Sequence, residues 1–376
     1  MEKSYHIAHF GTFDIESMGD SMFPNGLAFG MNRMCPCTYE LFSMSGCEKP
    51  YNNNNVVYSI SQFAERHLHH NFDAVILGGG EFLNFHQIHF NNCIYPAGYL
   101  WKEPIRLAQE RHIPIIINCV GVASDLTENE KEQLNSYLRN VAYISIRDNF
   151  SAKRLQTAKI HYATTVADNL WYMNQMYPQH EMCRLRQNLA ERFGRDYTAP
   201  YIIVQYGTTK DTKSLAQALR LIKAETGYRI LLMAVNYCHE DRVGMQMLYE
   251  EGNGEFELLD DYLQPPEMIA VISGAKTFMG TSLHGNLTAA SYGVPFIGID
   301  MYPSFVSKMD GIFSMIGCEA YLVPKETGVK AAFDARMADK KIGEYIESTI
   351  HEMQQKLDMH FAQIAELLKG NTDGEQ

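Results

Sequence analysis

The chain has 376 residues, which is enough for two domains of ordinary size. Hydrophobic residues make up 46% and charged residues 20%, so the chain is expected to bury a packed core. The net charge of −12 at pH 7 repels phosphate backbones, which excludes nucleic acid as a bulk partner.

No membrane or export segment is visible. The first six residues contain no apolar run typical of a signal peptide, and no segment approaches the roughly 18 apolar residues that span a bilayer. These features predict a cytoplasmic protein without a transmembrane segment.

Short apolar runs in the first half of the chain predict strands, and stretches of helical periodicity at 99–111 and 128–139 separate them. The predicted strands span residues 6–10, 73–77, 113–120 and 142–146. Near-continuous apolar strands joined by helices are typical of a parallel sheet covered on both faces. Residues 1–175 therefore predict a doubly wound, Rossmann-like α/β domain.

The same alternation returns after a polar linker at 176–199 that contains a predicted helix at 183–193. Its strands are predicted at 201–205, 229–235, 277–279 and 295–299. Residues 200–335 thus predict a second Rossmann-like domain, followed by a helical segment at 336–369 and a frayed tail at 370–376. Two such domains facing across a cleft bind ligands at the loops that follow their strands.

The most informative segment runs from Gly280 to Asn286, between a predicted strand and a predicted helix. Backbone N–H groups at a helix start form an anion site, aided by the helix dipole. Ser282 and His284 add side-chain donors, and Gly285 lets a ligand approach the backbone. His284 is a candidate phosphate donor or proton-transfer group near neutral pH. The structural alternative is a capped helix start with a histidine that only packs.

Two glycine-containing turns follow predicted strands of the first domain. Gly19 and Asp20 precede a helix predicted at 22–31, and Asp20 either caps that helix or acts as a base in the cleft. Gly78, Gly79 and Gly80 follow the second strand and, like Gly19, are predicted to line the cleft, although a tight turn alone also requires glycine.

Two cations are candidates for binding an anion. Arg147 directly follows the fourth predicted strand and either binds a ligand or forms an ion pair inside its domain. Lys308 either reaches the cleft or only flanks a helix predicted at 306–316.

These segments resemble, in their order along the chain, the motifs of polysaccharide pyruvyl transferases. Ser282-Leu283-His284-Gly285 resembles the C-terminal signature of that family, and Gly19-Asp20 resembles the end of its N-x-G-D element. Further matching segments are the glycine triplet at 78–80, Ser145-Ile146-Arg147-Asp148, Val166-Ala167-Asp168, and Lys308 with Phe313 and Gly317. Together they span roughly residues 7–318.

The resemblance implies a fold like that of B-type glycosyltransferases and a transferase activity. The implied donor is phosphoenolpyruvate, and the implied acceptor is a glycan or lipid-linked saccharide. The product is a pyruvate ketal of a surface polysaccharide or exopolysaccharide, made without a metal or cofactor. His284 and Asp20 are then the catalytic candidates, and Arg147, Ser282, Gly285, Asn286 and Lys308 the donor-binding ones.

The sequence differs from the family pattern at one position, and this difference leaves two alternative functions open. Members of the family often carry arginine where this chain has Ser282, and serine cannot hold a carboxylate or phosphate bidentately. Either Arg147 or Lys308 compensates, or the donor differs. The alternatives are a B-type glycosyltransferase that uses a nucleotide-sugar, and a non-catalytic glycan-binding protein.

Overall fold

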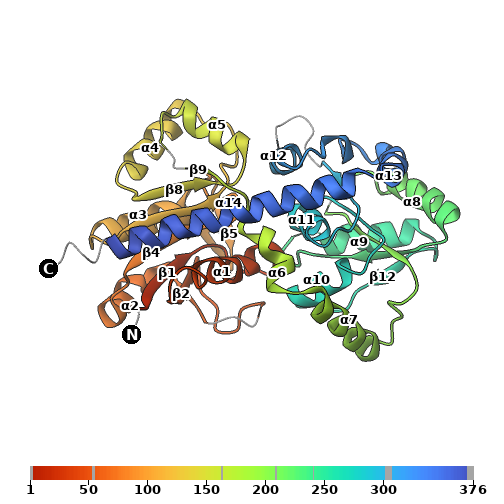
Figure 1. Ribbon diagram of the computed structural model, residues 1–376, viewed down its shortest axis with the longest axis horizontal. Helices are drawn as coiled ribbons and strands as arrows, with labels where there is room; N and C mark the ends of the chain where they lie inside the picture. Colours follow the sequence, from red (N-terminus) through yellow and green to blue (C-terminus); the bar gives the residue numbers. More distant parts are fainter. Residues whose placement is uncertain are drawn as a thin grey trace. The chain divides into compact units, whose positions relative to one another are not determined.

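The computed structural model describes residues 3–52, 56–161, 164–207, 210–239, 241–300 and 307–370. The chain forms two compact units. Unit 1 contains Met1–Ile15, Gly19–Leu170 and Met353–Gln376, and unit 2 contains Glu16–Met18 and Trp171–Glu352. Each unit is built on a parallel sheet with helices against it (Figure 1), which confirms the predicted α/β class. The tail predicted to fray lies outside the described residues, apart from Gly370 at the end of the last helix.

The sheet of unit 1 has the strand order β3-β2-β1-β4-β7-β8-β9, and its strands run parallel. Its strands are β1 (Tyr5–Phe10), β2 (Cys37–Ser43), β3 (Val57–Ser59), β4 (Ala74–Gly78), β7 (Ile115–Val120), β8 (Tyr143–Ile146) and β9 (Thr164–Thr165). The four strands predicted in the first half of the sequence are β1, β4, β7 and β8. A two-stranded antiparallel hairpin, β5 (Ile88–Phe90) and β6 (Cys93–Tyr95), lies outside this sheet.

Helices cover both faces of this sheet because consecutive strand residues point to opposite sides. Phe10, Val75 and Leu77 share one hydrophobic cluster with Trp101 and Ile105 of α3 (Tyr99–Gln109). On α14 (Ile342–Gly370), Phe361 packs so closely against Gly30 of α1 (Met18–Met31) that a β-carbon at position 30 would lie 2.2 Å from its ring. The helices that contribute to unit 1 are α1 (Met18–Met31), α2 (Phe63–His70), α3 (Tyr99–Gln109), α4 (Glu128–Leu138), α5 (Asn149–Thr157) and the second half of α14 (Ile342–Gly370).

Unit 2 has the strand order β12-β11-β10-β13-β14-β15, again parallel. Its strands are β10 (Tyr201–Gln205), β11 (Arg229–Met233), β12 (Glu257–Leu259), β13 (Thr277–Gly280), β14 (Phe296–Ile299) and β15 (Leu322–Val323). Its helices are α6 (Met173–Met176), α7 (Gln179–Phe193), α8 (Thr212–Thr226), α9 (Asp241–Glu251), α10 (Pro265–Ile272), α11 (Leu283–Ser291), α12 (Lys308–Met315), α13 (Val329–Ala338) and the first half of α14. Across both units, short 3₁₀ turns occupy Ile60–Gln62, Asn169–Tyr172, Glu319–Tyr321 and Glu326–Gly328.

Each sheet has one point where the strand order reverses direction. It lies between β1 and β4 in unit 1 and between β10 and β13 in unit 2. Open parallel sheets bind ligands at the carboxyl ends of the strands beside this point. The loops after β1 and β4, and those after β10 and β13, are therefore the positions where this fold is expected to bind ligands.

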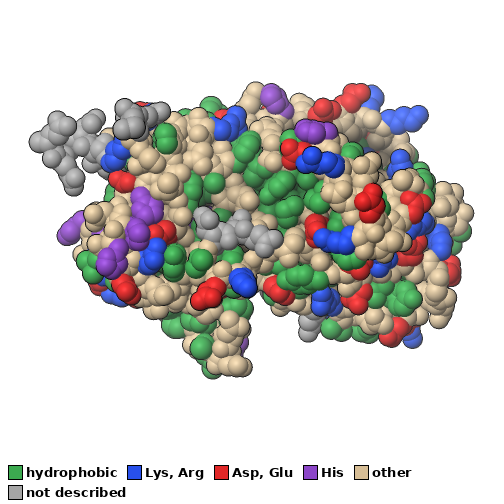
Figure 2. All heavy atoms as spheres, turned by 90° about the horizontal axis from the view of Figure 1, so that it is seen from below, with side chains coloured by type: hydrophobic (Ala, Val, Ile, Leu, Met, Phe, Trp, Pro, Cys, Tyr) green, Lys and Arg blue, Asp and Glu red, His purple; other side chains and the backbone are tan. Residues whose placement is uncertain are grey.

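The face shown in Figure 2 carries acidic side chains among basic ones, and histidines gather at the end of unit 1 that holds α2. Within the described ranges, no helix combines the length and the apolar character needed to cross a bilayer.

Two histidines of unit 1 are fully buried. His9 of β1 lies with Nε2 3.2 Å from the carbonyl of Gly78, and His360 of α14 lies with Nε2 2.7 Å from Oδ1 of Asn118. Burial away from water disfavours the charged imidazolium, and it lowers the pKa of each histidine to about 3.

The shifted pKa values predict a loss of stability in mild acid. The unfolded chain binds protons at these histidines near pH 6.5 and the folded chain does not, so the free energy of unfolding falls as pH decreases below 6.5. Each histidine is expected to remove about 1.4 kcal/mol between pH 7.5 and 5.5. Urea unfolding at both pH values measures this difference. His360→Gln should remove about half of the pH dependence, and equal stability at both pH values would contradict the assignment.

Candidate active-site residues

The turn from β13 to α11 is held by a network of short polar contacts. Ser282 is the N-cap of α11, and its Oγ accepts a hydrogen bond from the Gly285 N–H at 3.2 Å. The buried side chain of Gln205, at the end of β10, accepts hydrogen bonds through Oε1 from the Ser282 N–H at 2.7 Å and from Thr281 Oγ1 at 3.2 Å. The start of α11 is thereby fixed at the point where the strand order of unit 2 reverses.

Two further predicted residues of this turn have internal contacts. Asn286 donates through Nδ2 to the carbonyls of Gly280 at 3.0 Å and Ser282 at 2.8 Å. At Gly285, a β-carbon would lie 2.3 Å from the ring of Phe278, so only glycine fits there. These contacts shape the turn, and the dipole of the helix still favours an anion at its start.

His284 is the second residue of α11, in the first helical turn. Its carbonyl accepts a hydrogen bond from Thr288 Oγ1 at 2.7 Å, and the residue is half-buried. His284 therefore lies in the same helical turn that Ser282 caps.

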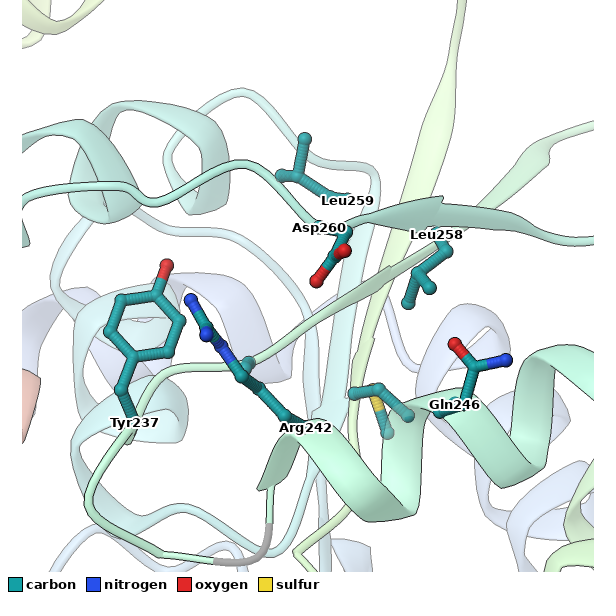
Figure 3. Close-up of a pocket in the computed structure, with 8 residues that line it drawn as sticks. Tyr237, Arg242, Gln246, Leu258, Leu259 and Asp260 are labelled. Carbon is teal, nitrogen blue, oxygen red and sulfur yellow. The ribbon is translucent and has the colours of Figure 1, made fainter.

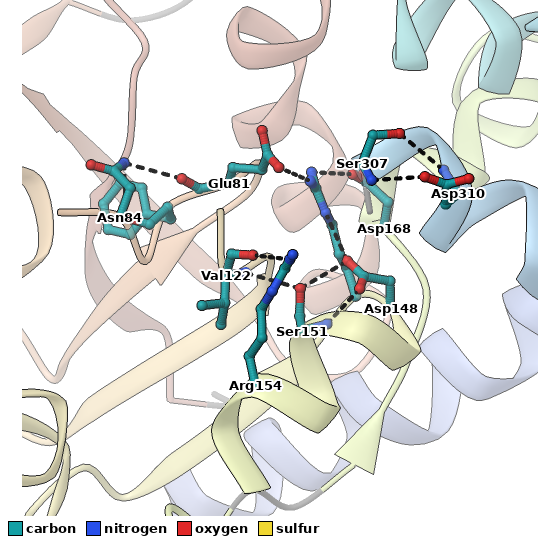
Figure 4. Close-up of polar contacts among 11 residues, drawn as sticks. Glu81, Asn84, Val122, Asp148, Ser151, Arg154, Asp168, Ser307 and Asp310 are labelled. Carbon is teal, nitrogen blue, oxygen red and sulfur yellow. Dashed lines mark hydrogen bonds and ion pairs between the residues drawn. The ribbon is translucent and has the colours of Figure 1, made fainter. Parts of the chain in front are cut away.

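Lys308 is the first residue of α12 and is exposed. Ser307 caps this helix, and the side chains of Ser307 and Asp310 each accept a hydrogen bond from the backbone N–H of the other residue (Figure 4). The cap fixes the helix start, while the lysine side chain extends from it.

Asp20 lies in the first turn of α1, because this helix begins at Met18 and not at residue 22 as predicted. Capping of a helix that starts after Asp20 is therefore not its role. Its Oδ1 accepts a hydrogen bond from Thr12 Oγ1 at 2.7 Å and would lie 3.5 Å from a β-carbon at Gly80. The loop after β1, the start of α1 and the turn after β4 thus meet at the reversal point of unit 1.

The glycine triplet is required by backbone conformation and by close packing. The φ angles of Gly78, Gly79 and Gly80 are +143°, +95° and +74°, a region that other residues rarely adopt. A β-carbon would lie 2.2 Å from the Asn118 carbonyl at position 78 and 2.2 Å from the ring of Phe23 at position 79. Only Gly80 has room on this criterion, on the side of Asp20.

Arg147 is almost completely buried, with 1% of its surface exposed. Its guanidinium lies 3.5 Å from Asp148, 3.8 Å from Glu81 and 3.9 Å from Asp168 (Figure 4). Asp148 also caps α5, where Oδ1 accepts a hydrogen bond from the Ser151 N–H at 2.7 Å. The charge of Arg147 is thus balanced by carboxylates of its own unit.

A hollow in unit 2 lies near the ends of β11 and β12 (Figure 3). It is lined by Ala234, Tyr237, Arg242, Met245, Gln246, Leu258, Leu259 and Asp260. The Arg242 guanidinium lies 4.3 Å from the centre of the Tyr237 ring. None of the residues predicted for the site lines this hollow.

Gln205 and Thr12, which position the Ser282 turn and Asp20, were not predicted from the sequence. One signal was available for Gln205, since a glutamine ends the otherwise apolar strand Tyr201–Gln205. A polar side chain at the carboxyl end of a buried parallel strand needs a partner, and ligand loops lie at that edge.

Comparison with known proteins adds a family and a fold. Residues 25–301 match the model of a family described as polysaccharide pyruvyl transferase, a span that includes the glycine triplet, Arg147 and the Ser282 turn but not Asp20 or Lys308. No curated protein matches the chain.

The solved structures that resemble the chain share its architecture at low sequence identity. UDP-GlcNAc 2-epimerase from Neisseria meningitidis, bound to UDP-GlcNAc, has a TM-score of 0.63 at 9% identity, covering 98% of this chain and 100% of that one. A glycosyltransferase from Rickettsia africae has 0.61 at 12% identity (99% and 97% covered), and sucrose-phosphate synthase from Thermosynechococcus elongatus has 0.60 at 10% identity (98% and 100% covered). Identities this low establish the shared fold alone.

Proposed function

The chain belongs to the polysaccharide pyruvyl transferase family, and we propose that it transfers the three-carbon unit of phosphoenolpyruvate to two hydroxyls of a glycan. The observation that carries this proposal is the turn from β13 to α11. This turn lies within the residues matched to the family, and His284 is in the first turn of α11. The backbone N–H groups and the dipole of a helix start favour a bound anion, which supports the proposal.

The reaction balances with one acid and one base. Protonation of the methylene carbon of phosphoenolpyruvate turns it into a methyl group and makes the adjacent carbon electrophilic. One sugar hydroxyl adds there, and the second displaces phosphate, which leaves a cyclic pyruvate ketal. The two sugar hydroxyls lose one proton each. One of these protons makes up for the proton taken up by the methyl group, and the other leaves with the phosphate. His284 is proposed as the acid, and Asp20 as the base toward the acceptor.

The donor's negative charges are proposed to rest on the start of α11 and on Lys308. Three carboxylates surround the buried guanidinium of Arg147, which favours Lys308 as the compensating cation where other family members have arginine in place of Ser282. In this proposal Arg147 is a positioning residue for the loops after β4 and β8.

A ligand-stabilisation experiment tests the donor. Phosphoenolpyruvate at about 100 times its Kd is expected to stabilise the folded chain by about 2.7 kcal/mol, seen as a rise in Tm. UDP-glucose and UDP-GlcNAc are expected to leave Tm unchanged. Stabilisation by the nucleotide-sugars alone would instead support the glycosyltransferase alternative.

A matched pair of lysine variants tests whether Lys308 binds phosphoenolpyruvate. Lys308→Ala is expected to reduce the shift with phosphoenolpyruvate, while Lys213→Ala, an exposed lysine on α8, should leave it intact. Equal shifts in both variants would remove Lys308 from the donor site.

A further inference from the structure

Residues 82–101 contain no Asp, Glu, Lys or Arg. Charged residues make up 20% of the chain, so a run of this length would on average hold about four. The run instead combines six aromatic residues with asparagine, glutamine and histidine. It begins directly after Glu81, in the loop that follows the glycine triplet.

This run builds the antiparallel hairpin β5–β6. The pairs across the hairpin are Ile88 with Tyr95, His89 with Ile94, and Phe90 with Cys93. Asn91 and Asn92 form the turn with positive φ angles of 49° and 60°, a conformation that asparagine tolerates and that matches the twist of a two-residue hairpin.

The two faces of the hairpin differ. Ile88, Phe90 and Tyr95 pack against the hydrophobic core of unit 1 and are partly buried. Because side chains alternate along a strand, His89 and Ile94 point to the opposite face, where both are exposed and Ile94 shows 64% of its surface. The exposed side chains on and around the hairpin are His86, Gln87, His89, Asn91, Asn92, Cys93, Ile94 and Pro96.

The hairpin is attached to unit 1 at several points. Asn91 donates through Nδ2 to Ser45 Oγ at 3.2 Å, and the rings of Tyr95 and Tyr99 lie 5.2 Å apart. At the base of the run, the buried Trp101 donates from Nε1 to the carbonyl of Asn84 at 2.8 Å, and Asn84 Nδ2 donates to the carbonyl of Glu81. Because these contacts already order the hairpin, binding of a ligand costs little conformational entropy.

The composition of the exposed face restricts its partner. Without lysine or arginine it does not attract phosphate or anionic lipid headgroups, and without carboxylates it does not attract a cationic peptide. Ile94 is the one large hydrophobic side chain that this surface exposes, which is too little apolar area for insertion into a bilayer. Amide and imidazole groups both donate and accept hydrogen bonds, as a ligand rich in hydroxyl groups requires.

We propose that the outer face of the β5–β6 hairpin binds an uncharged segment of a glycan. This inference rests on the proposed function and names the class of its acceptor. The hairpin follows the loop that holds Gly80 and Glu81, and Gly80 faces Asp20, the proposed base. A glycan lying on the hairpin extends from there toward the carboxyl edge of the unit 1 sheet.

Binding of labelled oligosaccharides, without any donor, tests the proposal. The probes are tetrasaccharides of glucose, galactose, mannose and N-acetylglucosamine, a galacturonic acid tetrasaccharide, and phosphatidylcholine vesicles. At least one uncharged tetrasaccharide is expected to bind the whole chain more tightly than the galacturonic acid probe. Gln87→Ala/His89→Ala is expected to weaken that binding about tenfold, since two hydrogen-bonding groups are removed.

The matched control is Gln187→Ala/His180→Ala, which removes the same exposed side chains from α7 of unit 2 and is expected to bind like the unmodified chain. Equal affinity of the two double variants for the uncharged tetrasaccharide overturns the proposal. It is also overturned if the chain prefers the galacturonic acid tetrasaccharide, if it binds no uncharged tetrasaccharide, or if it binds only the vesicles. Because no donor is present, these outcomes are independent of whether phosphoenolpyruvate stabilises the chain.

Discussion

His284→Ala is expected to lower kcat by about 10²-fold or more while the chain remains folded. A proton delivered by a positioned group contributes this much to a transfer reaction, and His284 lies in the first turn of α11, where we propose that the anionic donor binds. The measurement is phosphate release from phosphoenolpyruvate in the presence of the acceptor oligosaccharides. A loss in kcat with little change in KM separates proton transfer from donor binding.

Two variants distinguish this role from a structural one. Ser282→Ala removes the cap of α11, which is expected to cost about 1 kcal/mol of stability, so its effect on Tm calibrates damage to the helix start. His180→Ala changes a histidine on α7 that is 81% exposed, and it should leave both rate and Tm unchanged. A less than tenfold loss of rate in His284→Ala, with Tm intact, would demote His284 to packing.

The parallel strands were predictable because burial on both faces leaves a continuous apolar run. Tyr201–Gln205 was predicted with the bounds that the structure shows, and β1, β4, β7, β8, β11, β13 and β14 within two residues at either end. The strand β2 was not predicted, since Glu40 and Thr38 interrupt its apolar character. In the structure Glu40 is satisfied by Arg66, at 2.7 and 2.8 Å, a contact 26 residues away along the chain.

The local chemistry of the β13–α11 turn was also predictable, because a strand, two glycines, a serine and a helix follow one another directly. What lay beyond local reasoning were contacts made through the sheet. Gln205 reaches the Ser282 N–H from a strand 77 residues earlier, and Thr12 reaches Asp20 across a loop. Nor does sequence alone reveal that Arg147 is buried among carboxylates from two other segments, Glu81 and Asp168.

The burial of Arg147 leads to the second large effect, on stability. Arg147→Ala is expected to lower the free energy of unfolding of unit 1 by roughly 3–5 kcal/mol, because Asp148 and Asp168 are buried and lose their cation. Arg147→Lys keeps the charge but not the planar fork, so an intermediate loss is expected. Since Trp101 lies in unit 1 and Trp171 in unit 2, urea unfolding monitored by tryptophan fluorescence in a Trp171→Phe background reports on unit 1.

The matched control is Arg106→Ala on α3, whose arginine pairs with Glu103 and Glu110 at the surface and is 46% exposed. Exposed ion pairs contribute about 0–1 kcal/mol, so this variant should unfold almost like the unmodified chain. The two roles considered for Arg147 give opposite outcomes. An Arg147→Ala chain of normal stability that no longer responds to phosphoenolpyruvate would make Arg147 a donor ligand. A destabilised chain that still responds would leave the donor's charge to Lys308 and the start of α11.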